Sequence, residues 1–240
     1  LKIRGLRKSF DRPILAGLDL DINSGETFVV LGQSGTGKSV LLKIIVGLMP
    51  QDDGDVEVLG ESITGADEGR RFEIRKRFGM LFQNAALFDS MTILENVGFA
   101  FFESGLPPEE IRRRVKEKLA MVRLANIEEK LPAELSGGMK KRVGLARAIA
   151  SEPPILLYDE PTTGLDPVTS AVINRLIRRI QKELSITSIV VTHDLASAAF
   201  VGDRLGLLHE GRMRFIGPPA EFQLSADPVV RQFARGEAPG

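Results

Sequence analysis

The sequence contains no cysteine and no tryptophan, only one tyrosine and two histidines, and no long apolar run. The absence of cysteine excludes disulfide frameworks and thiolate metal sites, and it is compatible with a reducing compartment. No stretch approaches the roughly 20 apolar residues that span a bilayer, and the opening "LKIRGLRKSF" lacks the apolar core of a signal peptide. We therefore expect any membrane role to be peripheral. Because residue 1 is Leu and not Met, a short leader before it is left open.

An excess of charge of either sign is also missing. The 32 lysines and arginines balance the 32 aspartates and glutamates, so no overall basic field attracts nucleic acid, and we predict no nucleic-acid partner. With 43% hydrophobic residues, the 240-residue chain can fill the core of one sizeable α/β domain or of two modest ones.

Strand and helix patterns alternate along the chain. The β-branched run "ETFVVL" (26–31) predicts a strand that ends at a glycine loop, and a helical pattern follows the loop. The continuous apolar runs "PILLY" (154–158) and "SIVVT" (188–192) are typical of strands buried on both faces of a parallel sheet. A long helix between them is predicted to begin with Asp166 as N-cap and Pro167 as first residue. Its expected buried stripe is Val168, Val172, Ile173, Leu176, Ile177, Ile180 and Leu184. The pattern favours a doubly wound α/β core.

The middle of the chain, residues 86–150, shows helical patterns and no convincing strand. Pro107 and Pro108 open a charged helix with an acidic first turn, which suits the helix dipole. We interpret this stretch as a helical subdomain inserted into the sheet topology.

The glycine loop "GQSGTGKS" fits the phosphate-binding pattern G-x-x-x-x-G-K-[ST] in full, between a predicted strand and a predicted helix. Its residues are Gly32, Gln33, Ser34, Gly35, Thr36, Gly37, Lys38 and Ser39. Backbone N–H groups of such a loop converge on phosphates, Lys38 supplies a positive charge, and the Ser39 hydroxyl is a ligand for Mg²⁺. An ordinary glycine turn needs neither the Lys-Ser pair nor the flanking elements.

A carboxylate pair ends the apolar run "ILLYDEP". Asp159 is the hard oxygen ligand that Mg²⁺ prefers, and Glu160 is placed to act as general base or to orient water. Alone, this pair could be an ordinary acidic strand end. His193 follows "SIVVT" and should reach the same sheet edge, where it could contact the terminal phosphate, although a lone histidine is usually structural. Gln83 could bind the metal or the attacking water, whereas His209 is expected to be structural.

The order of these motifs, with "LSGG" (135–138) and "GLD" (164–166) between them, resembles the nucleotide-binding subunit of ABC transporters over essentially the whole chain. The resemblance implies Mg²⁺-dependent ATP hydrolysis in a head-to-tail homodimer. Ser136, Gly137 and Gly138 of one subunit would cap the γ-phosphate held by the other subunit's glycine loop. Asp166 would be a contact across the dimer, with its N-cap role an equally good local explanation.

The same resemblance assigns catalytic roles to Gln83, Lys38, Glu160 and His193, metal binding to Ser39, Gln83 and Asp159, and nucleotide contacts to the loop through Val40. Phe10 matches the aromatic residue that stacks on adenine, where stacking needs only the ring. The implied layout is a single ABC ATPase domain over 1–240. It has a RecA-like P-loop core of mostly parallel sheet with an antiparallel β portion (1–85 and 151–220), the helical subdomain (86–150) and a C-terminal tail (221–240).

Four stretches narrow the resemblance to the ATPases of the Mla, MCE-associated lipid transporters of Gram-negative envelopes: "GQSGTGKSVLLK", "MLFQNAALFDSMTILENV", "LSGGMKKRVGLARAIA" and "DPVVRQF". In that branch the usual signature glutamine is commonly methionine, as at Met139. The branch implies an integral permease, a periplasmic MCE-domain protein and a small STAS-domain protein as partners. It also implies a phospholipid-like substrate and a location on the cytoplasmic face of the inner membrane.

Several alternatives stay open at this level. The apolar stretch "AALFDSMTILENVGFAFF" predicts either a groove for a permease helix or the subdomain's own core. The tail could pack on its own domain or reach a dimer partner. The rival functions are an ABC importer or exporter subunit for another substrate and, more remotely, a soluble ABC ATPase acting on DNA or ribosomes. The second rival usually has two cassettes, coiled-coil arms or zinc modules, and none of these is evident here.

Overall fold

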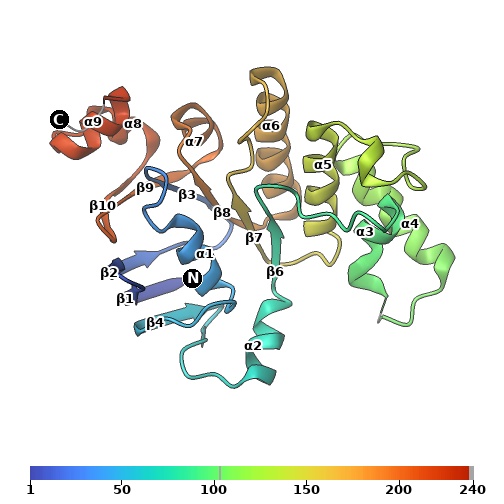
Figure 1. Ribbon diagram of the computed structural model, residues 1–240, viewed down its shortest axis with the longest axis horizontal. Coiled ribbons are helices and arrows are strands. Elements are labelled where there is room, and N and C mark those ends of the chain that lie inside the picture. Colours follow the sequence, from blue (N-terminus) through green and yellow to red (C-terminus); the bar gives the residue numbers. More distant parts are fainter. Residues whose placement is uncertain (103, 238–240) are drawn as a thin grey trace. The chain divides into compact units, whose positions relative to one another are not determined.

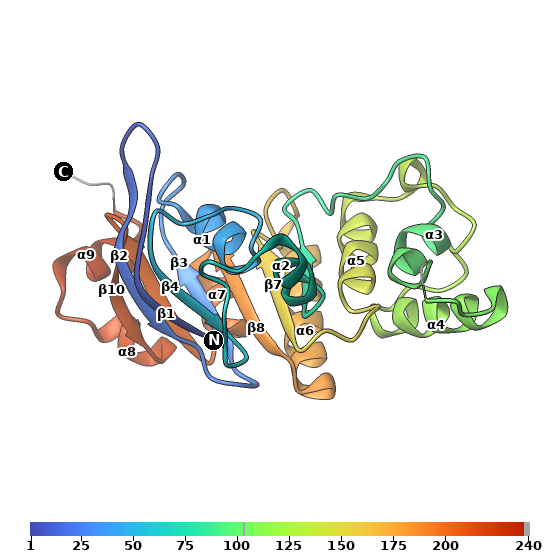
Figure 2. The ribbon, with the colours of Figure 1, turned by 90° about the horizontal axis from the view of Figure 1, so that it is seen from below.

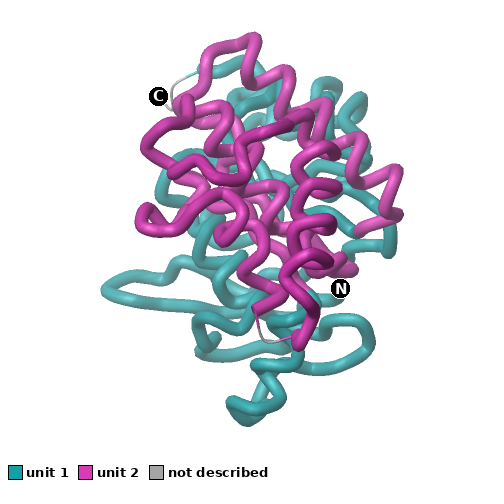
Figure 3. The backbone as a smooth tube through the Cα atoms, turned by 90° about the vertical axis from the view of Figure 1, so that its right-hand side faces the viewer, with its two compact units in different colours: residues 1–77, 187–240 teal, residues 78–186 magenta. Residues whose placement is uncertain are grey.

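The computed structural model describes residues 1–102 and 104–237 (Figure 1). One residue of the predicted helical subdomain and the last three of the predicted tail lie outside this description. The chain forms two compact units, coloured separately in Figure 3. Unit 1 comprises Leu1–Arg77 with Thr187–Gly240, and unit 2 is Phe78–Ile186.

Unit 1 contains the predicted buried parallel strands. Strand β3 (Thr27–Leu31) lies parallel to β8 (Thr187–Thr192) and to β9 (Arg204–His209), and β10 (Arg212–Gly217) pairs antiparallel with β9. All residues of β3 and β8 are buried, as expected for β-branched runs covered on both faces. The prediction of strands at 26–31 and 188–192 is confirmed.

Two helices of unit 1 follow these strands at their carboxyl ends. Helix α1 (Lys38–Ile45) follows β3, and α7 (Leu195–Val201) follows β8, with the Asp194 carboxylate accepting hydrogen bonds from two backbone N–H groups of α7. Parallel strands place their carboxyl ends at one edge of the sheet, so the loops before α1 and α7 emerge together.

A second, antiparallel sheet completes unit 1. Its strand order is β2-β1-β4-β5, and helix α2 (Glu68–Arg75) follows it; Figure 2 shows the long hairpin of β1 and β2. The strands are β1 (Lys2–Ser9), β2 (Pro13–Asp21), β4 (Asp53–Val58) and β5 (Glu61–Ser62). The hairpin is held to the first sheet of unit 1 by a hydrogen bond from the Ala16 N–H to the Gly211 carbonyl (2.9 Å).

Unit 2 combines a parallel strand pair with helices. Strand β6 pairs with β7, and helices α3, α4 and α5 pack on one another (Figure 2). The elements are β6 (Phe78–Leu81), α3 (Ile93–Gly98), η1 (Phe99–Phe101), α4 (Pro108–Met121), η2 (Pro132–Glu134), α5 (Gly137–Ala148), β7 (Ile155–Asp159) and α6 (Pro167–Leu184).

Helix α6 begins where the sequence predicts, with Asp166 as N-cap. Its central apolar residues Ile173, Ile177 and Ile180 are fully buried. The inclusion of Val168 in the buried stripe is wrong, because this side chain is 74% exposed. Val168 lies in the first turn, where a helix can extend past the core that its later turns cover.

The described part of the C-terminal tail packs on unit 1. Helices α8 (Pro219–Leu224) and α9 (Pro228–Arg235) meet through aromatic rings: the Phe222 ring lies 5.2 Å from that of Phe215 and 6.4 Å from that of Phe233. As far as residue 237, therefore, the tail is part of its own domain.

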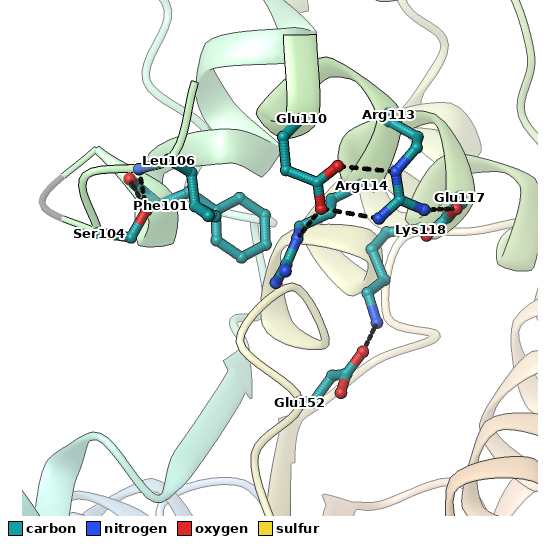
Figure 4. A network of polar contacts seen from close by, with 9 residues as sticks. All are labelled: Phe101, Ser104, Leu106, Glu110, Arg113, Arg114, Glu117, Lys118 and Glu152. Carbon is teal, nitrogen blue, oxygen red and sulfur yellow. Dashed lines mark hydrogen bonds and ion pairs between the residues drawn. The ribbon is translucent and has the colours of Figure 1, made fainter. Parts of the chain in front are cut away.

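Helix α4 carries a cluster of ion pairs around Glu110 and, separately, a buried lysine that pairs with Glu152 (Figure 4). Hydrogen bonds from Arg113 and Arg114 lower the pKa of Glu110 to about 2. One turn further, the Lys118 side chain is only 8% exposed, and its Nζ lies 2.7 Å from Oε1 of Glu152, the loop residue that follows α5. This ion pair links α4 to the end of α5, and it lowers the pKa of Glu152.

Replacing Glu152 by Gln should lower the free energy of unfolding by about 1 kcal/mol, because it leaves the buried Lys118 ammonium without its carboxylate. The loss is no larger because Glu152 itself is 72% exposed to solvent. Urea unfolding followed by circular dichroism measures the change. The control Glu117→Gln removes an exposed partner of Arg113 from the same helix and should have no resolvable effect. Since the folded-state pKa of Glu152 is lowered, its contribution is present at neutral pH and lost as the pH falls below about 4. Equal losses in both variants at pH 7 would contradict this role.

Candidate functional site

The glycine loop between β3 and α1 closes around the Lys38 ammonium. The Lys38 side chain is buried, and its Nζ donates to the carbonyl oxygens of Gly32 (2.8 Å) and Gln33 (3.0 Å). Gly37, directly before α1, has φ 101°, and a Cβ there would lie 2.6 Å from the Ile14 side chain. The loop therefore requires glycine at this position, and it holds the lysine inside its own curve.

The loop borders a cavity of about 440 Å³ in unit 1 that holds both histidines of the chain. Gln33 and Thr36 of the loop line it together with His193, at the end of β8, and His209, at the end of β9. Leu195 of α7, Leu207 and Leu208 of β9, and residues of α9 and its end, including the polar Gln232 and Glu237, complete the walls. The structure thus brings His193 to the phosphate-binding loop, as predicted from the parallel strands.

The position of His209 at this cavity is not predicted by the sequence pattern. Strand β9 runs parallel to β3, so its last residue reaches the same edge as the glycine loop. The signal was the run Leu205–Leu208, which predicts a β element but does not by itself say whether that element is parallel or antiparallel.

Phe10 lies between β1 and β2 and is 58% exposed, with the Lys8 Nζ 5.7 Å from its ring centre. A separate cavity of about 450 Å³ lies between this hairpin and the glycine loop. Arg12 and Ile14 line it, together with Gly35 and Thr36, whereas Phe10 does not. The hairpin turn therefore presents an exposed aromatic ring that is not part of this cavity.

In unit 2 the predicted carboxylates end strand β7. Asp159 is its last residue, and Glu160 follows with φ 47°, a left-handed conformation that is uncommon outside glycine and concentrates at functional sites. The Thr163 hydroxyl donates to Oε2 of Glu160 (3.1 Å). The turn thus fixes the orientation of the Glu160 carboxylate.

A buried lysine, Lys141, lies beside this pair and is not among the predicted site residues. The Lys141 Nζ, on α5, donates to the Glu160 carbonyl oxygen (3.2 Å). Burial lowers the pKa of Lys141, while the charges of Asp159 and Glu160 oppose that shift. In the basic stretch "MKKRVGLARA", only the spacing of Lys141 from Leu145 and Ala148 indicated that this lysine lies on the buried face.

The second glycine motif opens helix α5. The Ser136 Oγ accepts a hydrogen bond from the Met139 N–H (3.3 Å), and Ser136 and Gly137 are exposed, so the first turn presents backbone N–H groups to solvent. Asp166 likewise caps α6, accepting bonds from the Val168 and Thr169 N–H groups, both at 2.9 Å. Hydrogen bonds from Thr169 lower the pKa of Asp166. The N-cap prediction for Asp166 is confirmed.

The remaining candidates are divided between the units. Ser39 lies in the first turn of α1 in unit 1, and Gln83 is exposed in the turn after β6 in unit 2. Within the described ranges, no group of three or more His, Cys, Asp or Glu side chains is arranged to hold a metal. Of the three predicted magnesium ligands, Ser39 thus belongs to unit 1, and Gln83 and Asp159 belong to unit 2.

Among the residues that the structure describes, no helix is both long enough and apolar enough to cross a bilayer.

Comparison with known proteins gives consistent results. The chain is 43% identical over 242 residues to the probable ribonucleotide transport ATP-binding protein mkl of Mycobacterium leprae, covering all of this chain and 70% of that protein. It is 42% identical over 258 residues to the protein TRIGALACTOSYLDIACYLGLYCEROL 3 of Arabidopsis thaliana, a similarity that covers 100% of this chain and 74% of that protein. It is 38% identical over 234 residues to the intermembrane phospholipid transport system ATP-binding protein MlaF of Haemophilus influenzae, a similarity that covers 97% of this chain and 89% of that protein.

The fold agrees with these similarities. The dimeric structure of a bacterial ABC transporter cassette superposes with a TM-score of 0.84 at 33% identity, over 91% of this chain and 98% of that one. This match confirms the predicted fold class. The family model described as "ABC transporter" matches residues 15–163, more than half of the chain and a range that includes the glycine loop, the signature helix and the carboxylate pair. The chain therefore belongs to the ABC transporter family and is an ATP-binding, ATP-hydrolysing subunit of that family.

Proposed function

We propose that this chain powers the transport of phospholipid, or of a similar lipid, between the inner and outer membranes. The observation that carries the proposal is the similarity to the phospholipid transport ATPase of Haemophilus influenzae over nearly the whole length of both chains. The Arabidopsis relative, whose name refers to a glycerolipid, supports the same substrate class.

The glycine loop would hold the triphosphate of ATP. Its backbone N–H groups and the Lys38 ammonium supply the positive potential that the β- and γ-phosphates require. Ser39, Gln83 and Asp159 offer the hard oxygen atoms that suit Mg²⁺, which when bound neutralises charge on the β- and γ-phosphate oxygens. Phe10, exposed in the turn between β1 and β2, would offer its ring to the adenine.

Hydrolysis would depend on Glu160 and His193. Glu160 orients a water for attack on the γ-phosphorus and accepts its proton as the bond from that phosphorus to the bridging oxygen breaks, releasing ADP and phosphate. His193 contacts the γ-phosphate, and the bond from Thr163 keeps the Glu160 carboxylate in place.

The active form would be a head-to-tail homodimer. In it, Ser136, Gly137 and Gly138 of one subunit bring the positive N-terminus of α5 to the γ-phosphate bound by the other. Asp166, besides capping α6, would contact the partner subunit. The similarity to a cassette whose structure is dimeric supports this assembly.

An exposed aromatic groove supports a membrane partner. A cavity of about 480 Å³ in unit 2 is lined by several aromatic side chains, among them Phe88 and Phe99, which are 44% and 47% exposed. Their exposure favours the view that this stretch is more than the subdomain's own core. A permease helix would fill such a groove.

The complex would also include an MCE-domain periplasmic protein and a small STAS-domain protein, with this chain peripheral on the cytoplasmic face of the inner membrane. The second candidate is an ABC importer or exporter subunit for another substrate. The mkl relative, whose name refers to ribonucleotide transport, keeps that candidate in view.

Glu160→Gln should reduce ATP turnover about a hundredfold or more while ATP still binds, because the amide cannot accept the proton of water. The variant should accumulate as a dimer when ATP is added. Phosphate release and size-exclusion chromatography measure both effects, with Glu183→Gln, an exposed carboxylate on α6, as the control. Normal turnover in Glu160→Gln would remove this residue from its role.

Ser136→Arg should abolish hydrolysis with little change in the affinity of the isolated subunit for ATP, since the bulky side chain obstructs a site formed with a second copy. Ser136→Ala is the control: it removes the N-cap, at about 1 kcal/mol, without adding bulk, and should reduce hydrolysis far less. Fluorescent nucleotide titration gives the affinity. A large loss of affinity in monomeric Ser136→Arg would mean that the loop acts on the nucleotide of its own chain.

Affinity purification from detergent-solubilised membranes, with identification of the co-purifying proteins and lipids, tests the transport proposal. We expect a permease, an MCE-domain protein and phospholipid. Phe88→Glu should lose the permease by placing a charge in the groove, whereas Phe200→Glu, an exposed phenylalanine on α7, should retain it. Capture of an amino-acid-type permease without an MCE-domain protein would overturn the lipid assignment.

A further inference from the structure

Arg147, in the last turn of α5, holds the turn that carries Gln83. Its Nη1 donates to the Ala86 carbonyl oxygen (2.7 Å), and its Nη2 donates to the Ala85 carbonyl oxygen (2.8 Å). The Arg147 side chain is half-buried, and this burial lowers its pKa. Two carbonyl groups in succession are thus bound by one planar side chain, which has the fork geometry that such a pair requires.

The turn that Arg147 holds has an uncommon conformation. Ala85 and Ala86 have φ values of 59° and 48°, in the left-handed region that residues with a Cβ rarely occupy. Such a conformation persists only where the surroundings enforce it. Apart from Arg147, the Ala85 N–H donates to the Phe82 carbonyl oxygen (2.9 Å), which closes the turn around Gln83.

Helix α5 also packs directly against this turn. A Cβ added at Gly144, one turn before Arg147, would lie 2.9 Å from Cδ1 of Leu81 and 3.2 Å from Cβ of Ala85. Glycine at this position lets the helix approach closely enough for Arg147 to reach both carbonyl groups. Helix α5, which begins at the "LSGG" motif, is therefore hydrogen-bonded at its C-terminal end to the turn that contains Gln83.

The same guanidinium contacts the aromatic groove. It lies 5.7 Å from the ring centre of Phe88, whose ring is 5.0 Å from that of Phe99. The buried Asn96 fixes Phe88 by accepting from its N–H (2.8 Å) and donating to its carbonyl oxygen (3.0 Å). The Arg147 guanidinium therefore contacts both the Phe88 ring of the groove and the turn that carries Gln83.

We propose that Arg147 is a positioning residue that fixes the turn of Gln83 for hydrolysis. The inference rests on the proposed role of Gln83, and it adds the residue that holds the Gln83 turn. Lysine cannot take this place fully, because a single ammonium lacks the planar fork that bonds two carbonyls and stacks on a ring.

The test compares Arg147→Met and Arg147→Lys with a matched control in the full-length chain. Arg142, also on α5, donates to the Arg123 carbonyl oxygen (3.1 Å), and Arg123 likewise has a positive φ (58°). Arg142→Met therefore removes an arginine that binds a left-handed turn elsewhere. Hydrogen exchange of amides 83–88 reports the turn, and the MgATP dependence of hydrolysis gives kcat and KM separately.

In Arg147→Met we expect exchange at 83–88 to rise about tenfold and kcat to fall about tenfold, with KM changed less than about twofold. Arg147→Lys should recover part of both effects, which keeps the test informative if the methionine variant folds poorly. Arg142→Met should leave exchange at 83–88 and kcat unchanged. Combined with Gln83→Ala, Arg147→Met should lower kcat no further, because both changes remove the same function.

Three results would overturn the inference: unchanged kcat in Arg147→Met despite faster exchange at 83–88, an equal loss in Arg142→Met, or losses that multiply in the double variant. Full kcat in Gln83→Ala would instead refute the role assigned to Gln83 itself. The two failures are therefore distinguishable.

Discussion

Parallel pairing of buried strands is the constraint from which the chemistry of this chain follows. In unit 1, β3, β8 and β9 run in the same direction, so their carboxyl ends lie at one edge of the sheet. The glycine loop follows β3, His193 follows β8, and His209 is the last residue of β9. Because the strands are buried on both faces, their ends are where the backbone can leave the sheet and present polar groups to a ligand.

Helix N-termini provide the second recurring device. Ser136 and Asp166 each satisfy backbone N–H groups at the start of a helix, and we propose that the motif of each also acts at the nucleotide. A cap oxygen and a bound anion both accept hydrogen bonds from N–H groups at the positive end of a helix dipole. Stability and function therefore coincide at these positions, and local structure alone does not separate them.

The proposed role of Gln83 depends on a well-fixed turn in unit 2. Gln83 sits in a left-handed turn bound by Arg147, whose guanidinium lies 5.7 Å from the ring centre of Phe88. A flexible loop would leave the Gln83 side chain free to move. Two charge-assisted hydrogen bonds and the close approach of α5 at Gly144 instead hold this turn in one conformation.

The sequence by itself determined the chemistry that depends on local order: the glycine loop between a strand and a helix, the carboxylate pair that ends β7, the cap at Asp166 and the family. Each is written in consecutive residues, because turns, caps and phosphate loops form over a few positions. Only the tertiary structure decided that Lys141 is buried, that Arg147 binds the Ala85 and Ala86 carbonyl groups, and that His209 joins His193 at one cavity. It also decided that Val168 is exposed. These facts depend on which strands and helices pack together, and residues distant in the sequence determine that packing.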